Sequence, residues 1–385
     1  MKIKIRFYYF IIATTIIFSS ISLPLKAGKN GPDDLFGSML DSGKSIGFGF
    51  LQLSYPTKVD DEKAKELLKL FLEKGGHFID TAAVYGENRH NEKLLGKCLQ
   101  SLGRQNFVIA TKCGIDFDTM SYTQSPKAIR DSLEESLKSL AVDSVDVLYL
   151  HRIDPDASQD QLAATIRTMK ELVKEGRVKR IGLSEPSAEQ IRFCHGVEPR
   201  DVPISTVESA YSIAARRVED NGVLDTCKEL GILFVAYTPV VRGMVDERLQ
   251  KITASDFKIL SDSEFQKRVF ELLNITSKND SRRDVGWFLE KNIKHNVGKI
   301  LAFHNEAKRI GCSPSQLALA WLAKKKGVMS IPATTNPSHL SENMASLGVE
   351  LSPQDIETLD KLFSPGTFLG NPNPLSLSKF DPADF

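Results

Sequence analysis

Four side chains in the first half of the chain could together move a proton. They are an acid, a phenol, an amine and an imidazole, namely Asp80, Tyr85, Lys112 and His151. Each ends or closely follows a short apolar run that is typical of a strand. Because the C-terminal ends of parallel strands meet at one side of a barrel, we expect the four side chains to converge there. The sequence therefore predicts a proton-donating site.

The segments that would position this site alternate between strands and helices. Short apolar runs predict eight strands, at residues 46–50, 77–80, 107–111, 145–150, 178–183, 203–207, 231–236 and 328–331. Each is followed by helical periodicity, at residues 60–74, 91–100, 126–140, 159–175, 187–194, 216–230, 314–325 and 338–347. This alternation predicts an α/β fold with a parallel sheet, and eight units predict a closed (β/α)8 TIM barrel. A doubly wound open sheet is the alternative. The absence of a G-x-G-x-x-G motif after the first strand counts against it.

Two further regions extend the predicted barrel. Residues 245–294 form a long, charged loop after the seventh strand. Loops of this length inside a domain are typically functional lids or disordered segments. After the eighth unit the chain continues as a C-terminal helix and tail, so we expect one barrel domain over residues 38–385.

The N-terminus differs in character from the rest of the chain. Three basic residues precede the apolar run Phe7–Phe18, and a small, polar segment leads to Ala27. This pattern predicts a secretory signal peptide over residues 1–27, followed by a linker over residues 28–37. An uncleaved membrane anchor is the alternative, although the apolar run is short for a spanning helix.

Composition excludes several classes of function. The formal net charge of +1 gives no reason to expect nucleic-acid binding. The five cysteines are scattered, odd in number and without a C-x-x-C pair, so neither a disulfide framework nor a zinc site is indicated. We expect no metal.

From about Leu40 to about Phe363 the chain resembles the aldo-keto reductases. The resemblance rests on motifs in the family's order: Asp80-Thr-Ala-x-x-Tyr85-Gly86, Thr111-Lys112, Leu150-His151-Arg-x-Asp154, Gly182-Leu-Ser184-Glu185, Tyr211-Ser212, Tyr237-Thr-Pro239 and Ile331-Pro-x-Thr-Thr335. Within the family, residues 220–232 and the Ser184-Glu185 pair are similar to pyridoxal reductases and their relatives.

The resemblance implies an NAD(P)H-dependent oxidoreductase that reduces small aldehydes or ketones to alcohols. Tyr85 would be the general acid, and Lys112 would lower the phenol pKa from its usual value near 10. Asp80 would hold the Lys112 ammonium, and His151 would orient the substrate oxygen.

The resemblance also implies a set of cofactor-binding residues. Ser184 would bind the nicotinamide carboxamide, Tyr211 would stack on the ring, and Pro239 and Arg242 would line the pyrophosphate. The helix near residue 338 would present its N-terminus to the adenosine phosphate. The other implied positions are Glu185, Glu208, Thr334, Thr335, His339, Glu342 and Asn343.

Several of these positions depart from the family pattern. Asn336 and His339 stand where the family often has a lysine and an arginine that hold the 2′-phosphate of NADP. We therefore expect NADP from the family and leave NAD open. Glu208 stands where many members have a glutamine, and Val241 replaces a common glycine beside the pyrophosphate.

Two functions remain open at this point. The intact tetrad favours an enzyme, whereas a non-catalytic, cofactor-binding regulatory subunit is the alternative. The leader indicates export, while the cysteines and the cofactor chemistry indicate the cytoplasm, so the localisation stays open. Aromatic residues in loops on the active side would form an apolar substrate pocket: Phe50, Tyr55, Phe117 and Trp287.

Overall fold

Eight parallel strands form one sheet at the centre of the computed structural model, which describes residues 46–56, 58–278 and 280–380. The strands lie in the order β1 (Phe48–Gly49), β2 (Phe78–Asp80), β3 (Val108–Cys113), β6 (Val145–Leu150), β7 (Val178–Ser184), β8 (Ile204–Ala210), β9 (Leu233–Tyr237) and β10 (Val328–Ser330). A separate antiparallel pair, β4 (Ile115–Asp116) and β5 (Ser121–Tyr122), lies in the loop after β3.

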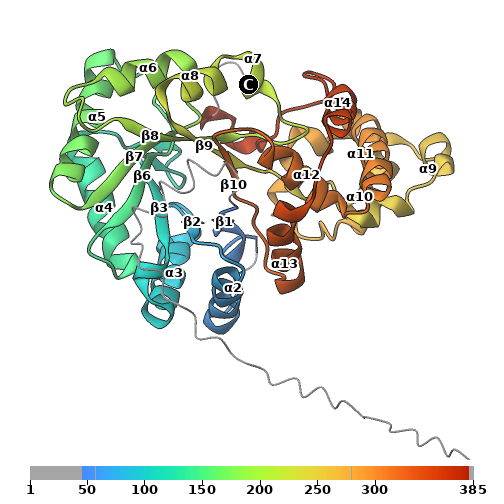
Figure 1. Cartoon of the computed structure of the whole chain (residues 1–385), viewed down its shortest axis with the longest axis horizontal. Helices are drawn as coiled ribbons and strands as arrows, with labels where there is room; N and C mark the ends of the chain where they lie inside the picture. Colours follow the sequence, from blue (N-terminus) through green and yellow to red (C-terminus); the bar gives the residue numbers. More distant parts are fainter. Residues whose placement is uncertain (1–45, 57, 279, 381–385) are drawn as a thin grey trace, which may run out of the picture.

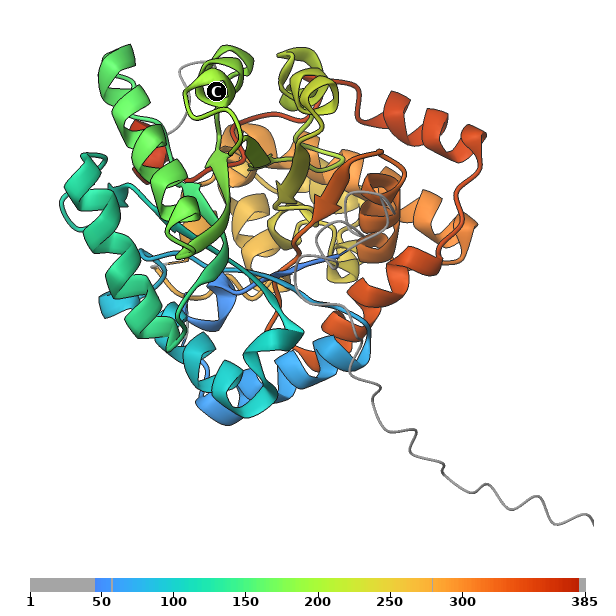
Figure 2. The ribbon, with the colours of Figure 1, turned by 60° about the vertical axis from the view of Figure 1, so that its left-hand side comes forward.

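The two edges of this sheet meet. Ile46 forms a parallel bridge to Ser330, and the amide of Gly47 donates to the Ser330 carbonyl at 2.8 Å. The helices surround the strands on the outside (Figure 1 and Figure 2), and α2 lies beside α13 although they are far apart in sequence. The predicted (β/α)8 TIM barrel is confirmed.

The helices of the barrel begin and end close to the expected residues. They are α2 (Asp61–Glu73), α3 (His90–Leu102), α4 (Pro126–Leu140), α5 (Gln159–Lys174), α6 (Ala188–Gly196), α7 (Arg217–Asp220), α8 (Val223–Leu230), α12 (Pro314–Ala323), α13 (Pro337–Ala345) and α14 (Pro353–Leu362). Serine caps fix many of their starts: Ser158, Ser187 and Ser313 each exchange hydrogen bonds with a glutamine three residues later.

The structure corrects the prediction of one helix over residues 216–230. The chain forms two helices there, α7 and α8, because Gly222 between them adopts a left-handed conformation with φ of +79°.

Residues 245–294 are folded rather than an open loop. They contain α9 (Ala254–Ile259), α10 (Asp262–Leu272) and the start of α11 (Glu290–Ile310), a helix the sequence analysis did not predict. These helices lie together beside the barrel, on the side of α12 and α14 (Figure 1). Phe265 and Val269 of α10 and Ile293 of α11 are buried, so apolar packing holds the insertion in place.

The expected signal peptide and linker, residues 1–37, lie outside the described residues. Within the described part of the chain, no helix is both long and apolar enough to cross a membrane.

Candidate active site

The strands β2, β3 and β6 bring the predicted catalytic residues to one mouth of the barrel. Side chains two residues apart on a strand share a face. Phe78, Ala110 and Tyr149 belong to the buried cluster inside the barrel. Asp80 and Lys112 lie two residues further along their strands, so they close the same interior at its C-terminal end.

The ammonium of Lys112 is the centre of the site. It contacts an Asp80 carboxylate oxygen in a close ion pair, and it donates to the Thr81 carbonyl at 3.1 Å. It lies 3.2 Å from the Tyr85 hydroxyl oxygen and 3.4 Å from Glu208 Oε2. Lys112 is fully buried and Asp80 is 2% exposed, so protein groups replace the water that would otherwise surround this charge.

The loop that carries Tyr85 is anchored on both sides. The amide of Tyr85 donates to the Ala82 carbonyl, and the Tyr85 carbonyl accepts from the amide of Asn91. The buried side chain of Asn91 then donates to the Phe50 carbonyl at 2.8 Å and to Ser54 Oγ at 2.7 Å. The sequence analysis missed Asn91. Its only signal was a polar residue at the start of a helix with an apolar face.

Burial shifts the protonation of Tyr85. Desolvation raises its pKa to about 12, because the opposing charge of Lys112 offsets only part of that effect. The expectation of a lowered pKa therefore does not describe the balance in this site. At neutral pH Tyr85 is a phenol that carries a proton to give.

His151 faces the same space. Its ring meets the Tyr85 ring edge-on, with centroids 5.9 Å apart, and lies 6.1 Å from the ring of Phe117. Burial holds the pKa of His151 well below 6.5, and the neighbouring charges of Arg152 and Lys112 act in the same direction. The imidazole is therefore neutral at pH 7, with a buried Nδ1 that has no hydrogen-bond partner among the described residues.

Glu208 of β8 is a second buried acid beside the Asp80–Lys112 pair. It is 3% exposed, and desolvation with the nearby Asp80 charge raises its pKa well above the usual range of a glutamate. The implied contact of this position with a nicotinamide carboxamide stays a prediction.

The other implied nicotinamide residues lie at the ends of β7 and β8. Ser184 is buried and its Oγ accepts from Arg152 at 2.9 Å. The carboxylate of Glu185 accepts from the amide of Ala210 at 2.7 Å and pairs with Arg217 at 3.0 Å. Arg152 belongs to the motif around His151, but the sequence analysis gave it no role.

Tyr211 is not among the side chains that the structure brings to the mouth. It is fully buried, it meets Phe234 and Trp321 edge-on, and its hydroxyl donates to Glu219 at 2.6 Å. Trp321 belongs to α12, outside the sheet. This position leaves no face of the Tyr211 ring open for a cofactor.

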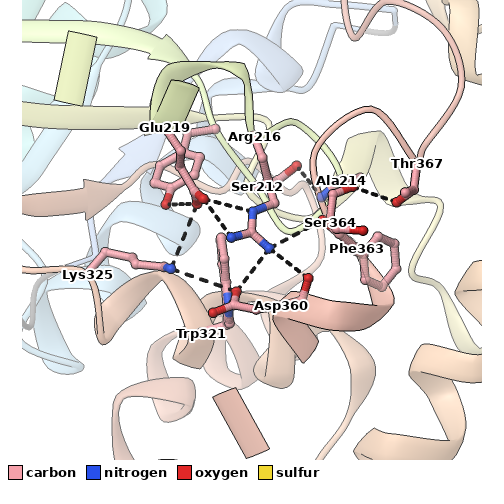
Figure 3. A network of polar contacts seen from close by, with 11 residues as sticks. Ser212, Ala214, Arg216, Glu219, Trp321, Lys325, Asp360, Phe363, Ser364 and Thr367 are labelled. Atoms are coloured by element: carbon pink, nitrogen blue, oxygen red, sulfur yellow. Dashed lines mark hydrogen bonds and ion pairs between the residues drawn. The ribbon is translucent and has the colours of Figure 1, made fainter. Parts of the chain in front are cut away.

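The contacts around Tyr211 belong to a network that joins the loop after β8 to α14 (Figure 3). Arg216 pairs with Glu219 at 2.6 Å and with Asp360 at 3.0 Å, and it donates to the Phe363 carbonyl. Trp321 donates to Asp360 at 3.0 Å, and the Lys325 ammonium lies 4.3 Å from the Trp321 ring centroid. The network fixes the helix from which the C-terminal tail departs.

Tyr237, the last residue of β9, lies on the interior side of the barrel. Its strand neighbours Leu233 and Val235 line the barrel interior, and Tyr237 packs against that cluster. Its hydroxyl donates to Asn373 Oδ1 at 3.1 Å. Tyr237 falls within one of the family-like motifs but had no predicted role, because apolar residues face both sides of this buried strand.

The loop after β9 carries the expected pyrophosphate residues. Pro239 is buried, and Thr238, Val241 and Arg242 all have φ between +51° and +56°, a conformation that non-glycine residues adopt at a cost. Arg242 Nε donates to the Pro372 carbonyl at 2.5 Å, and its Nη2 donates to Asn373 Oδ1 at 3.2 Å.

The expected adenosine-side residues gather around the N-terminus of α13. Asn336 caps this helix by accepting from the amide of Ser338 at 2.9 Å, and Thr334 Oγ1 accepts from the amide of Asn336. His339 is exposed, and Thr335 is half-buried. Further along α13, Glu342 accepts a hydrogen bond from Ser313 and Asn343 is buried.

The C-terminal tail reaches across the mouth of the barrel. Phe380 is buried against Phe117 and Tyr122, with ring centroids 5.5 Å and 5.2 Å away. Its carbonyl accepts from Arg152 Nε at 2.9 Å. Of the expected pocket aromatics, Phe117 contacts the ring of His151. Phe50 and Trp287 are buried in the core, and Tyr55 is 37% exposed.

Comparisons with known proteins agree with this arrangement. The model of the aldo/keto reductase family matches residues 45–363. The chain is 34% identical to "Probable aldo-keto reductase 1" of Glycine max over 82% of this chain and 84% of that protein. It is also 34% identical to an aldo-keto reductase of Gibberella moniliformis, over 82% of this chain and 89% of that protein.

A solved structure has a similar fold. The crystal structure of a thermostable aldo-keto reductase in complex with the inhibitor epalrestat superposes with a TM-score of 0.59 and 25% identity. The similarity covers 83% of this chain and 94% of that one.

Proposed function

Because this chain belongs to the aldo/keto reductase family, we propose that it reduces a small aldehyde or ketone with a hydride from NAD(P)H, and that Tyr85 donates the proton. The observation that carries this proposal is the contact between the Tyr85 hydroxyl and the buried Lys112 ammonium, with His151 at the same mouth. The bound nicotinamide would supply the hydride to the carbonyl carbon.

The protein groups would act on the carbonyl oxygen. The neutral His151 imidazole would donate a hydrogen bond to it and orient it. As negative charge develops on that oxygen, Tyr85 would transfer its proton and Lys112 would stabilise the phenolate that remains. Asp80 would keep the ammonium in place through its ion pair. Each of these groups is already positioned, so little reorganisation accompanies the reaction.

The residues at the mouth fit a nicotinamide dinucleotide. Buried polar atoms without a hydrogen-bond partner among the described residues include His151 Nδ1 and Thr238 Oγ1. Tyr237 would take the stacking position, and Ser184 with Glu208 would contact the carboxamide. Arg242 would bind the pyrophosphate after exchanging its contacts with the tail.

Selection between NADPH and NADH would be weak. The two positions where the family often carries permanent cations hold Asn336, which is engaged as a helix cap, and the exposed His339. Thr334, Thr335 and the α13 N-terminus would remain as neutral donors to a phosphate, with Glu342 and Asn343 beside the adenine.

Steady-state reduction of 4-nitrobenzaldehyde with NADPH and with NADH tests the proposal. We expect the purified protein to oxidise both cofactors and Tyr85→Phe to lose this activity. Equal turnover by the variant would remove Tyr85 as the proton donor, and no turnover by the wild type with any aldehyde would remove the proposed reaction.

A further inference from the structure

Glu208 has no part in the proposed proton transfer, although its side chain would contact the carboxamide of a bound nicotinamide. It lies on β8, across the barrel from Asp80 of β2 and Lys112 of β3. Its Oε2 is 3.4 Å from the Lys112 ammonium, which also forms a close ion pair with an Asp80 carboxylate oxygen. Two acids therefore share the surroundings of one base inside the barrel.

The charges at this place do not balance if both acids ionise. One ammonium between two carboxylates leaves a net negative charge in a space where Asp80, Lys112 and Glu208 are all at least 96% buried. An uncompensated buried charge costs several kcal/mol even after relaxation. Retaining one proton removes that cost.

The lack of hydrogen-bond donors at these two acids also indicates a retained proton. Asp80 Oδ2 and Glu208 Oε2 are buried, and neither has a donor among the described residues. Two carboxylates cannot bond to each other, because both are acceptors only, whereas one carboxylic acid donates to a carboxylate. Retaining a single proton would turn one of these acceptors into a donor.

We propose that Glu208 and Asp80 hold one proton between them beside the Lys112 ammonium, which makes Glu208 a positioning residue for the acid–base state of Tyr85. Glu208 acts through Lys112, whose charge is shared between Asp80 and Tyr85 while Glu208 stays neutral. When Glu208 loses the proton, the added negative charge disfavours the Tyr85 phenolate. The link to catalysis rests on the proposed function, and the shared proton does not.

The groups that face Glu208 come from several elements and act in both directions. Asp80 opposes its ionisation, while Lys112 and Arg152 favour it. The Glu208 charge in turn raises the pKa of Tyr85 and of the buried Tyr149. The ionisable groups that matter for the test are therefore Asp80, Tyr85, Lys112, Tyr149 and Arg152.

Glu208→Gln keeps the shape of the side chain and removes its proton equilibrium. Glu189→Gln, at an exposed position of α6, is the matched control. Infrared spectra of the full chain at neutral pH, without cofactor, should show the carbonyl stretch of a protonated carboxylic acid in the wild type and in Glu189→Gln. Glu208→Gln should lack it. A wild-type spectrum without this band, or a band that persists in Glu208→Gln, would overturn the shared proton.

The effect on Tyr85 has its own readout. Alkaline titration of tyrosinate absorbance, with Tyr85→Phe subtracted, should place the ionisation of Tyr85 at lower pH in Glu208→Gln by about one unit, a tenfold change in its equilibrium constant. If the enzyme is active, the alkaline limb of alcohol oxidation should move the same way. Superimposed titrations would overturn the positioning role, and neither spectroscopic readout depends on turnover.

Discussion

Replacing Lys112 by methionine removes the charge at the centre of the site while keeping an unbranched side chain. The Lys112 ammonium lies 3.2 Å from the Tyr85 hydroxyl oxygen. At that separation a unit charge on the forming phenolate would gain about 5 kcal/mol, with an effective dielectric constant of about 20. Loss of this stabilisation from the transition state corresponds to a rate decrease on the order of 10³- to 10⁴-fold.

The same change destabilises the fold in a pH-dependent way. Without Lys112 the Asp80 carboxylate is buried and unpaired, which costs about 3–5 kcal/mol. Its pKa in the folded variant rises, so the folded state binds a proton that the unfolded state has released above pH ~4. Stability of the variant therefore falls as pH rises, and the difference from the wild type grows between pH 5 and pH 8.

Two measurements check this prediction. We expect kcat/KM for 4-nitrobenzaldehyde to fall as stated, and urea unfolding to show the larger loss at pH 8. Lys97→Met is the control, because the Lys97–Asp61 pair is exposed on the surface and should contribute less than about 1 kcal/mol. The reasoning is wrong if Lys112→Met keeps activity within tenfold of the wild type, or if its loss of stability is the same at both pH values.

Three further changes test other parts of the account. Arg216→Ala should lower the free energy of unfolding by about 3–5 kcal/mol in urea, because Glu219 and Asp360 lose a buried partner, whereas Arg192→Ala at an exposed pair should cost under about 1 kcal/mol. Burial lowers the pKa of His151, so the unfolded state binds a proton at a higher pH than the folded state and stability falls as pH drops below 6.5. His151→Gln should reduce the slope of unfolding free energy against pH by up to about 1.4 kcal/mol per pH unit. An unchanged slope would contradict the neutral imidazole. His339→Arg adds a permanent cation near the α13 N-terminus and leaves the Asn336 cap intact. The ratio of NADPH to NADH affinity, measured by fluorescence quenching, should therefore rise about 10- to 150-fold. An unchanged ratio would place the adenosine phosphate elsewhere.

The sequence was sufficient to predict the barrel and the side chains that meet at its mouth. Asp80, Lys112 and His151 each follow a strand with a clear apolar pattern, and parallel strands align their ends without any need to know the packing between them. Helix starts were equally local, because a serine cap and its partner lie only three residues apart.

Which of two tyrosines lies at the barrel mouth depended on information that the sequence does not contain. Tyr211 and Tyr237 both lie at the ends of buried strands, and only the register of β8 and β9 decides which ring enters the barrel mouth. Tyr211 lies one residue beyond β8 and faces α12, while Tyr237 ends β9 on the interior side. A shift of one residue reverses the face of a strand, so the motif alone could not distinguish them.

The contacts of the C-terminal tail and the fold of residues 245–294 were also not predicted, because both depend on packing between distant parts of the chain. Phe380 meets Phe117, and Asn373 meets Tyr237 and Arg242, across separations of more than a hundred residues. Residues 245–294 were interpreted as a functional lid or a disordered segment because the loop is long and charged, although Phe265, Val269 and Ile293 are buried and hold its helices in place.

The central claim is that Tyr85 protonates a carbonyl oxygen while a hydride reaches the carbonyl carbon. Its most direct test is single-turnover reduction of 4-nitrobenzaldehyde with nicotinamide cofactor deuterated at the transferred position, followed by nuclear magnetic resonance. The account predicts deuterium on the alcohol carbon with the wild type, and a decrease on the order of 10³-fold or more with Tyr85→Phe at unchanged cofactor affinity. Alcohol without deuterium, or equal rates for the two proteins, would contradict it.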